Sequence, residues 1–190
     1  MDRVSTVAAV VLAAGGGRRY GMPKALVEYE GSLLVERAVR TARAVCDPVL
    51  VVLGAQAVDV WQRADLEGAT VLANRDWETG MASSLRTGLD GLRGWPGRVD
   101  AALVTLVDMP GMTPEALGRV AALAAPDALA VAAYDGVRGH PVLLGREHWA
   151  GVAETATGDE GARRYLAEHD VVAVDCTGLA DPTDLDVPPS

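Results

Sequence analysis

A cluster of glycines followed by basic side chains is the part of this sequence best suited to chemistry. An apolar run stops at three consecutive glycines, residues 15–17, and Arg18, Arg19 and Lys24 follow. Glycines let the backbone turn sharply and bring bare N–H groups close to an anion. Pro23 disfavours helix at the residue before it, so Lys24 is expected on an extended or turning loop from which it can reach a ligand. The segment therefore predicts a phosphate-binding loop.

Two better-known glycine loops fit this segment less well. The dinucleotide-binding fingerprint requires Gly or Ala where this chain has Tyr20, and an acidic residue near the end of the second strand, where it has Gly54 and Ala55. The Walker loop requires Gly, Lys and Ser or Thr in succession, whereas two residues separate Gly21 from Lys24 here. A secretory signal is a further alternative, but the apolar run is short and two arginines follow it closely.

Strands and helices are expected to alternate along the chain. Hydrophobic patterning predicts strands at 7–14, 49–53, 70–73, 101–107, 129–134, 141–144 and 171–174, and helices at 33–45, 58–63, 81–92, 114–123 and 159–168. Thr113 is a candidate N-cap, and residues 135–139 form a turn. Such alternation indicates an α/β fold, a Rossmann-like three-layer sandwich with a mostly parallel sheet. The Pro- and Asp-rich tail from Gly178 onward is typical of a frayed end.

The strand ends bring polar residues from distant segments together. Ligands of such sheets bind at the carboxyl ends of the strands. Gly15 follows the first predicted strand, Asn74 the third and Asp108 the fourth, so we expect all three in one crevice. Asp108 is the best candidate for a Mg²⁺ ligand, since Mg²⁺ commonly uses one or two protein carboxylates together with phosphates and water.

Composition limits the classes of protein that remain. The 190 residues are 49% hydrophobic and 23% charged, as expected for a single globular domain over 1–190. The net charge of −9 argues against binding to nucleic acid or anionic membranes, so a phosphate ligand must be bound locally. No apolar run is long enough to span a membrane. Cys46 and Cys176 are expected to be buried thiols, which favours the cytoplasm, and the three histidines form no metal-binding pattern.

Several segments resemble those of the MobA-like nucleotidyltransferases, most closely the molybdenum cofactor cytidylyltransferase branch. The matching segments are 12–24 (LAAGGGRRYGMPK), 74–85 (NRDWETGMASSL), 106–110 (LVDMP), 139–144 (GHPVLL), 158–163 (GDEGAR) and 184–188 (DLDVP). Arg19, Gly21 and Lys24 fall on the family's positions in the first segment. Two residues depart from the pattern: Gly17 replaces a Ser of the loop, and Val187 replaces a Thr of the last segment.

The resemblance implies a Mg²⁺-dependent enzyme with the nucleotidyltransferase type of this fold. It would move a nucleoside monophosphate, CMP from CTP in particular because Ala14 stands where guanylyl enzymes have Gly, onto the phosphate of molybdopterin. The acceptor phosphate is already an ionised nucleophile, so the chemistry requires charge control rather than a general base. Its product would pass to a molybdenum hydroxylase.

Each expected site residue has an assigned role. Arg19, Lys24 and Asp108 are the catalytic candidates, and Asp108 and, by resemblance, Asp186 the metal ligands. The expected nucleotide-binding residues are Leu12, Ala13, Ala14, Gly15, Gly16, Gly17, Arg18, Arg19, Lys24, Asn74, Gly80, Ser84 and Asp108. Trp77, His140 and Arg163 are the candidates for acceptor binding, although Trp77 fits a core position equally well and His140 a packed loop.

Other functions remain open. Sugar phosphates, methylerythritol phosphate and small phosphorylated acids are alternative acceptors. A cofactor chaperone without catalysis is a second class, against which the presence of Lys24 and Asp108 argues. A nicotinamide- or flavin-dependent reductase is a third, against which the incomplete dinucleotide fingerprint argues.

Overall fold

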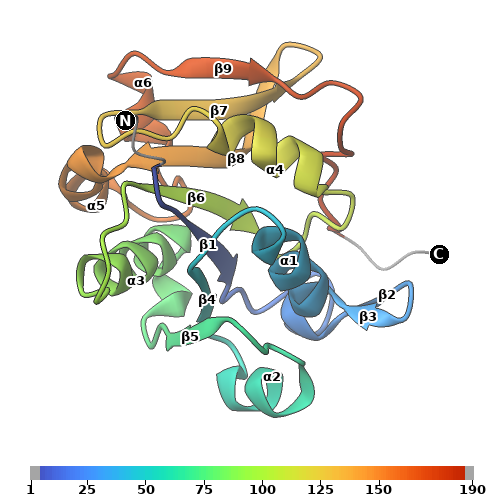
Figure 1. Ribbon diagram of the computed structural model, residues 1–190. Coiled ribbons are helices and arrows are strands. Elements are labelled where there is room, and N and C mark those ends of the chain that lie inside the picture. The colour runs from blue at the N-terminus through green and yellow to red at the C-terminus, as the bar shows by residue number, and fades with distance from the viewer. Residues whose placement is uncertain (1–4, 187–190) are drawn as a thin grey trace.

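A seven-stranded sheet with helices on both faces forms the protein (Figure 1). The computed structural model describes residues 5–186. The strands are β1 (Val7–Ala13), β4 (Val49–Leu53), β5 (Thr70–Ala73), β6 (Ala101–Leu106), β7 (Leu129–Tyr134), β8 (Val137–Gly145) and β9 (Val172–Asp175). Their order across the sheet is β5-β4-β1-β6-β8-β7-β9.

The sheet is mostly parallel, as the alternation of strands and helices predicted. β1 pairs in parallel with β4 and β6, β4 with β5, and β7 with β9. β8 alone among the described strands of this sheet runs antiparallel to both of its neighbours, β6 and β7. The carboxyl ends of β1, β4, β5 and β6 therefore meet at one edge, which is the edge that the sequence predicted for the ligand crevice.

The helices form the two outer layers (Figure 1). The helices are α1 (Leu34–Arg43), α2 (Ala57–Arg63), α3 (Met81–Arg93), α4 (Pro114–Ala121), α5 (Trp149–Thr155) and α6 (Arg163–Ala167), with single 3-10 turns at η1 (Lys24–Leu26), η2 (Trp77–Thr79) and η3 (Arg146–His148). α1 and α4 cover one face, α3, α5 and α6 cover the other, and α2 lies beyond β5. A small hairpin of β2 (Glu28–Tyr29) and β3 (Ser32–Leu33) precedes α1.

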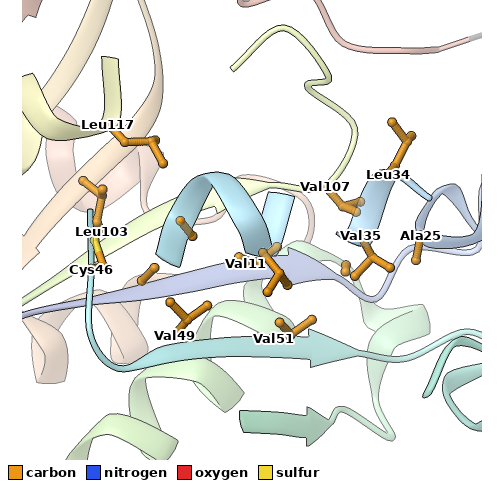
Figure 2. Close-up of a cluster of buried hydrophobic side chains, with 14 of the residues drawn as sticks. Val11, Ala25, Leu34, Val35, Cys46, Val49, Val51, Leu103, Val107 and Leu117 are labelled. Carbon is orange, nitrogen blue, oxygen red and sulfur yellow. The ribbon is translucent and has the colours of Figure 1, made fainter. Parts of the chain in front are cut away.

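Burial on both faces explains why the central strands are continuously apolar. Val10 and Val11 are both fully buried, but they point into different hydrophobic clusters on opposite sides of the sheet. Figure 2 shows the α1 side, where Val11 of β1 and Val51 of β4 face Val35 of the helix. The apolar run that opens the sequence is thus the central strand of the sheet. Cys46 and Cys176 are buried free thiols, as expected.

Some elements differ from the sequence prediction. The turn at 135–139 is shorter than expected, because Asp135 and Gly136, with φ of 49° and 80°, close a tight hairpin and β8 begins at once. The predicted helix at 159–168 begins only at Arg163, since Gly158 and Gly161 have φ of 52° and 55°. By contrast, the predicted N-cap is confirmed: the Thr113 hydroxyl accepts a hydrogen bond from the N–H of Ala116 at 3.2 Å.

None of the described helices is long and apolar enough to cross a membrane.

Candidate active site

The glycine loop leaves β1 at the carboxyl edge of the sheet. Its most constrained residue is Gly17, whose φ is +60°. A Cβ at this position would lie 1.8 Å from the carbonyl oxygen of Met22, so the loop has no room for a side chain here. The Gly17 carbonyl in turn accepts hydrogen bonds from Tyr20 and Gly21, both at 2.9 Å. The loop conformation therefore requires the glycine that stands at position 17 in place of the family's serine.

The basic residues of the loop differ in their surroundings. Arg18 and Arg19 are exposed and form no ion pair with any residue of the described chain, which leaves both guanidinium groups available to a phosphate. Lys24 is the first residue of η1, a single 3-10 turn directly after Pro23, so it lies on a turning segment and outside the α-helices. Its side chain points inward and is 17% exposed.

Lys24 joins two carboxylates from distant parts of the chain. Its Nζ lies 2.8 Å from Oδ2 of Asp108 and 3.2 Å from Oδ1 of Asp186. Asp108 follows β6, and Asp186 lies in the C-terminal tail, 162 residues away from the lysine. The structure thus brings together Lys24, Asp108 and Asp186, three of the four residues that the sequence assigned to catalysis or metal binding. The fourth, Arg19, is exposed and forms no ion pair with either carboxylate.

Specific contacts hold the tail over this site, so residues 178–186 are not a frayed end. Thr113 donates its hydroxyl to the carbonyl of Leu179 at 2.7 Å, and the N–H of Asp181 donates to Gly111 at 3.2 Å. The N–H of Leu185 donates to the Asp108 carbonyl at 2.8 Å, which places Asp186 beside the lysine. Val187 and Pro188 of the last matching segment lie outside the described residues.

The charge of this cluster favours a protonated lysine. Burial, the largest single influence, lowers the pKa of Lys24, but hydrogen bonds and charge from Asp108 and then Asp186 outweigh it, so that the pKa is raised overall. The ammonium group therefore stays charged and holds the two carboxylates together.

The two carboxylates also suit a hard divalent cation. Oxygens of Asp108 and Asp186 converge on one point, which the lysine ammonium occupies here. Among the described residues, no group of three or more His, Cys, Asp or Glu side chains forms a complete metal cage. Two carboxylates with an open side fit Mg²⁺ or Mn²⁺, which complete their coordination with phosphates and water.

A large cavity of about 620 Å³ lies beside the carboxylates on the α3 face of the sheet. Its apolar walls include Leu12, Leu85, Val104, Leu106, Met109, Val131, Val142 and Leu144, and its polar lining includes Arg138, His140, Asp159, Arg163 and Asp184. This volume is typical of small-molecule sites. Met109 and Asp184, the neighbours of Asp108 and Leu185, connect the cavity to the carboxylate cluster.

Two of the three expected acceptor-binding residues, His140 and Arg163, line this cavity. Burial strongly lowers the pKa of His140, to about 4, although Asp108 acts to raise it and Arg163 lowers it further. The imidazole is therefore neutral near pH 7 and can exchange hydrogen bonds with a ligand without adding charge. Its backbone is fixed by Tyr134, whose hydroxyl donates to the His140 carbonyl at 2.9 Å.

Because His140 is neutral in the fold, we expect the protein to lose stability as the pH falls. The unfolded chain has an ordinary histidine pKa of 6.5 against about 4 in the fold, so the unfolded state binds more protons between these values. The free energy of unfolding should rise with pH across this window, by roughly 2 kcal/mol after allowance for the partial exposure of the ring. We expect His140→Gln to flatten this slope in urea unfolding of the metal-free protein between about pH 4.5 and 7. An unchanged slope would mean that His140 is not the group responsible.

Four further expected residues, Asn74, Trp77, Gly80 and Ser84, lie outside the lining of the cavity. Asn74 and Ser84 are 5% and 4% exposed, and their side chains bond to each other at 2.9 Å. Gly80 is the N-cap residue that precedes α3, and it packs against Gly158. Trp77 packs against the glycine loop and is not among the described residues that line the cavity.

Sequence reasoning missed several polar residues of the cavity, including Arg138 and Asp159. Arg138 was assigned to a turn, and only the close hairpin moves it onto β8 at the cavity wall. Asp159 lies inside the matching segment GDEGAR, but only Arg163 was singled out there. In the structure its Oδ1 accepts a hydrogen bond from the N–H of Met81 at 3.2 Å, so a protein carboxylate already caps the start of α3.

A family model matches most of the chain, including the glycine loop. Residues 9–173 match the MobA-like NTP transferase domain. The chain belongs to the MobA-like NTP transferase family. The resemblance inferred from the sequence motifs is therefore confirmed.

Proteins that are similar in sequence to this chain have different names. The chain is 38% identical to nicotine blue oxidoreductase of Paenarthrobacter nicotinovorans, over 95% of this chain and 92% of that protein. It is 22% identical to the molybdenum cofactor cytidylyltransferase of Escherichia coli (strain K12), over 75% of this chain and 72% of that one. Membership of the family therefore does not by itself choose between these two activities.

Solved structures share the same architecture. A protein from Mycobacterium sp. strain JC1, a homologue of Rv0371c of Mycobacterium tuberculosis, matches with a TM-score of 0.83 at 30% identity, over 95% of this chain and 90% of that one. The Rv0371c protein itself, in complex with manganese, matches with a TM-score of 0.76 at 26% identity, over 95% and 94% of the two chains. These matches confirm the Rossmann-like three-layer fold.

Proposed function

We propose that this protein is a divalent-metal-dependent nucleotidyltransferase that moves CMP from CTP onto a phosphorylated acceptor of the molybdopterin type. The observation that carries the proposal is the convergence of Lys24, Asp108 and Asp186 beside a glycine loop at the carboxyl edge of the sheet. Manganese in the related mycobacterial structure supports a divalent cation, and Mg²⁺ is the ion we expect here.

Different residues have different roles in the transfer. The glycine-loop amides and Arg19 hold the triphosphate, and Lys24 offsets charge that builds toward the leaving group. Asp108 and Asp186 would hold a divalent cation, which would supply positive charge to offset that of the phosphates. An oxygen of the acceptor phosphate forms a bond to the α-phosphorus, while the bond from that phosphorus to the bridging oxygen breaks and pyrophosphate leaves with the electron pair. No general base is needed, because the acceptor phosphate is already ionised.

The lining of the cavity favours an acceptor with a ring system rather than a sugar phosphate. Its walls are largely leucine, valine and methionine, and hydroxyl groups buried against them would lose hydrogen bonds to water without replacement. The charged lining is mixed: Asp159, Glu160 and Asp184 lie in it, and Arg138 and Arg163 supply the guanidinium groups with which an anionic group of the acceptor can pair.

The assay for this function combines the protein with Mg²⁺ or Mn²⁺, each of the four ribonucleoside triphosphates and a panel of phosphorylated acceptors, and measures pyrophosphate. We expect release only when a triphosphate and a molybdopterin-type acceptor are both present. A chaperone without catalysis would bind the cofactor and release none.

The choice of nucleotide should respond to Ala14. This residue is 4% exposed, and its methyl group packs at the junction of β1 and the glycine loop. Ala14→Gly should let the backbone make room for a larger purine and shift the ratio of kcat/KM for CTP and GTP toward GTP. One methyl group is worth about 1–3 kcal/mol of discrimination, so we expect a shifted preference rather than exclusion.

The matched control is Ala8→Gly, on the same face of β1 at its other end, which should leave the ratio unchanged. Equal or better use of GTP by the unaltered protein would contradict the cytidylyl assignment while leaving the wider class intact.

A reductase is the second candidate, because the oxidoreductase relative is similar over 95% of this chain. The apolar cavity also suits a flat, weakly polar substrate. Against it, β4 ends at Leu53 and is followed by Gly54, Ala55 and Gln56, with no carboxylate to hold a ribose hydroxyl. Oxidation of NADH or NADPH without pyrophosphate release would favour the reductase.

A further inference from the structure

A buried polar network fixes the segment between β5 and α3. The Nδ2 of Asn74 donates to Ser83 and Ser84 at 2.8 and 2.9 Å, and its Oδ1 accepts from the N–H of Asp76 at 2.9 Å. The Ser83 hydroxyl also lies 3.0 Å from the Asp76 carbonyl. Both amide hydrogens of Asn74 are therefore used inside the protein, and they anchor the short turn that carries Trp77.

The indole of Trp77 lies against the backbone of two glycines at two strand ends. A Cβ at Gly16 would lie 3.0 Å from its Cζ3 and 3.1 Å from its Cη2. A Cβ at Gly54 would lie 2.5 Å from the Trp77 Cβ and 2.7 Å from the Ala14 carbonyl oxygen. The approach at Gly54 requires a residue without a side chain, whereas a Cβ at Gly16 would require the ring or the loop to shift slightly.

The same contacts connect Trp77 to the residue expected to sense the base. The Ala14 carbonyl accepts a hydrogen bond from the N–H of Ala55 at 2.9 Å, which joins the loop after β1 to the loop after β4. Trp77 contacts Gly54 at this junction and Gly16 in the glycine loop.

We infer that Trp77 is a positioning residue of the nucleotide subsite, where it supports the glycine loop, and that it does not bind the acceptor. The assignment of a nucleotide to this loop rests on the proposed function. A loop that is held in its binding conformation before the ligand arrives loses less entropy on binding. Removing the indole should therefore weaken nucleotide binding and leave the acceptor cavity, whose described lining does not include Trp77, intact.

The test compares Trp77→Ala, Trp77→Phe and the matched control Trp61→Ala, whose side chain on α2 is 63% exposed. In Trp77→Ala we expect the Kd for CTP with Mn²⁺, measured without acceptor, to rise about 10-fold, and the KM for CTP to rise in parallel while the KM for the acceptor stays unchanged. Trp77→Phe should recover most of the affinity, and Trp61→Ala should behave like the unaltered protein.

A double-mutant cycle tests the contact itself. Gly16→Ala should weaken CTP binding when Trp77 is present, because the new methyl group must displace the ring or the loop, and should have little further effect in Trp77→Ala. The same cycle in urea unfolding needs no ligand and should show the same non-additivity.

Two results would overturn the inference: an unchanged Kd for CTP with a raised acceptor KM in Trp77→Ala, or additive effects of the two substitutions on unfolding. Absence of CTP binding by the unaltered protein, together with non-additive unfolding, would instead contradict the proposed function and leave the support of the loop by Trp77 standing.

Discussion

Lys24→Ala should lose about 10²-fold or more in turnover while remaining folded, the scale expected when one preorganised charge donor is removed. The ammonium group is the only protein cation in contact with both Asp108 and Asp186 within the described chain, and it lies beside the loop that we assign to the triphosphate. Its removal also leaves the two carboxylates without a shared counter-ion. We therefore expect Mn²⁺ binding to be retained or strengthened, even as pyrophosphate release falls.

Lys24→Arg is the informative comparison, since a planar guanidinium does not reproduce a compact ammonium and should rescue turnover poorly. Circular dichroism and the melting temperature establish that both variants fold. Near-normal turnover in Lys24→Ala would remove Lys24 from the catalytic set.

Asp108→Asn should have the opposite effect on the metal and a similarly large effect on turnover. The substitution keeps the shape of the side chain but deletes the charge that pairs with Lys24 and that we assign to the cation. We expect Mn²⁺ affinity, measured by titration without nucleotide, to fall about 10-fold or more, the scale of losing a strong metal contact.

Asp186→Asn should change both quantities in the same direction but less, because its side chain is 53% exposed against 20% for Asp108. Asp170→Asn, an exposed carboxylate between α6 and β9, is the matched control and should change neither. Lost turnover with unchanged Mn²⁺ affinity in Asp108→Asn would show that this residue acts through Lys24 alone.

Local sequence patterns predicted most of the sheet and the part of the site that follows it. β1 and β6 are continuously apolar and buried on both faces, so Gly15 and Asp108 could be placed at neighbouring strand ends from periodicity alone. Lys24 could be placed near them, since the glycine loop is short.

Other elements were missed, or begin earlier than predicted, for identifiable physical reasons. β2 and β3 have two residues each, too few for an alternating pattern to emerge. The antiparallel strand β8 begins in the hairpin at Val137, where exposed residues conceal its start. α5 buries only Trp149 and Val152, so it has little helical periodicity.

The long-range parts of the site depend on contacts that no local pattern contains. Asp186 is placed by hydrogen bonds from the tail to the loops after β6, and only the family resemblance pointed to it. The sequence placed Trp77 among the acceptor-binding candidates, because an indole ring suits stacking on a pterin as well as it suits a core position. Its true neighbours, Gly16 and Gly54, become apparent only when three strand ends are assembled.

The most direct test of the central claim follows the α-phosphorus of CTP. The protein is incubated with Mg²⁺, CTP labelled at that atom and a molybdopterin-type acceptor, and both labelled product and pyrophosphate are quantified. Our account predicts that the label enters the acceptor with one pyrophosphate released per label transferred, and that Lys24→Ala and Asp108→Asn abolish most of both. Unlabelled acceptor and no pyrophosphate, with NADPH oxidised by the same protein in a parallel reaction, would contradict it.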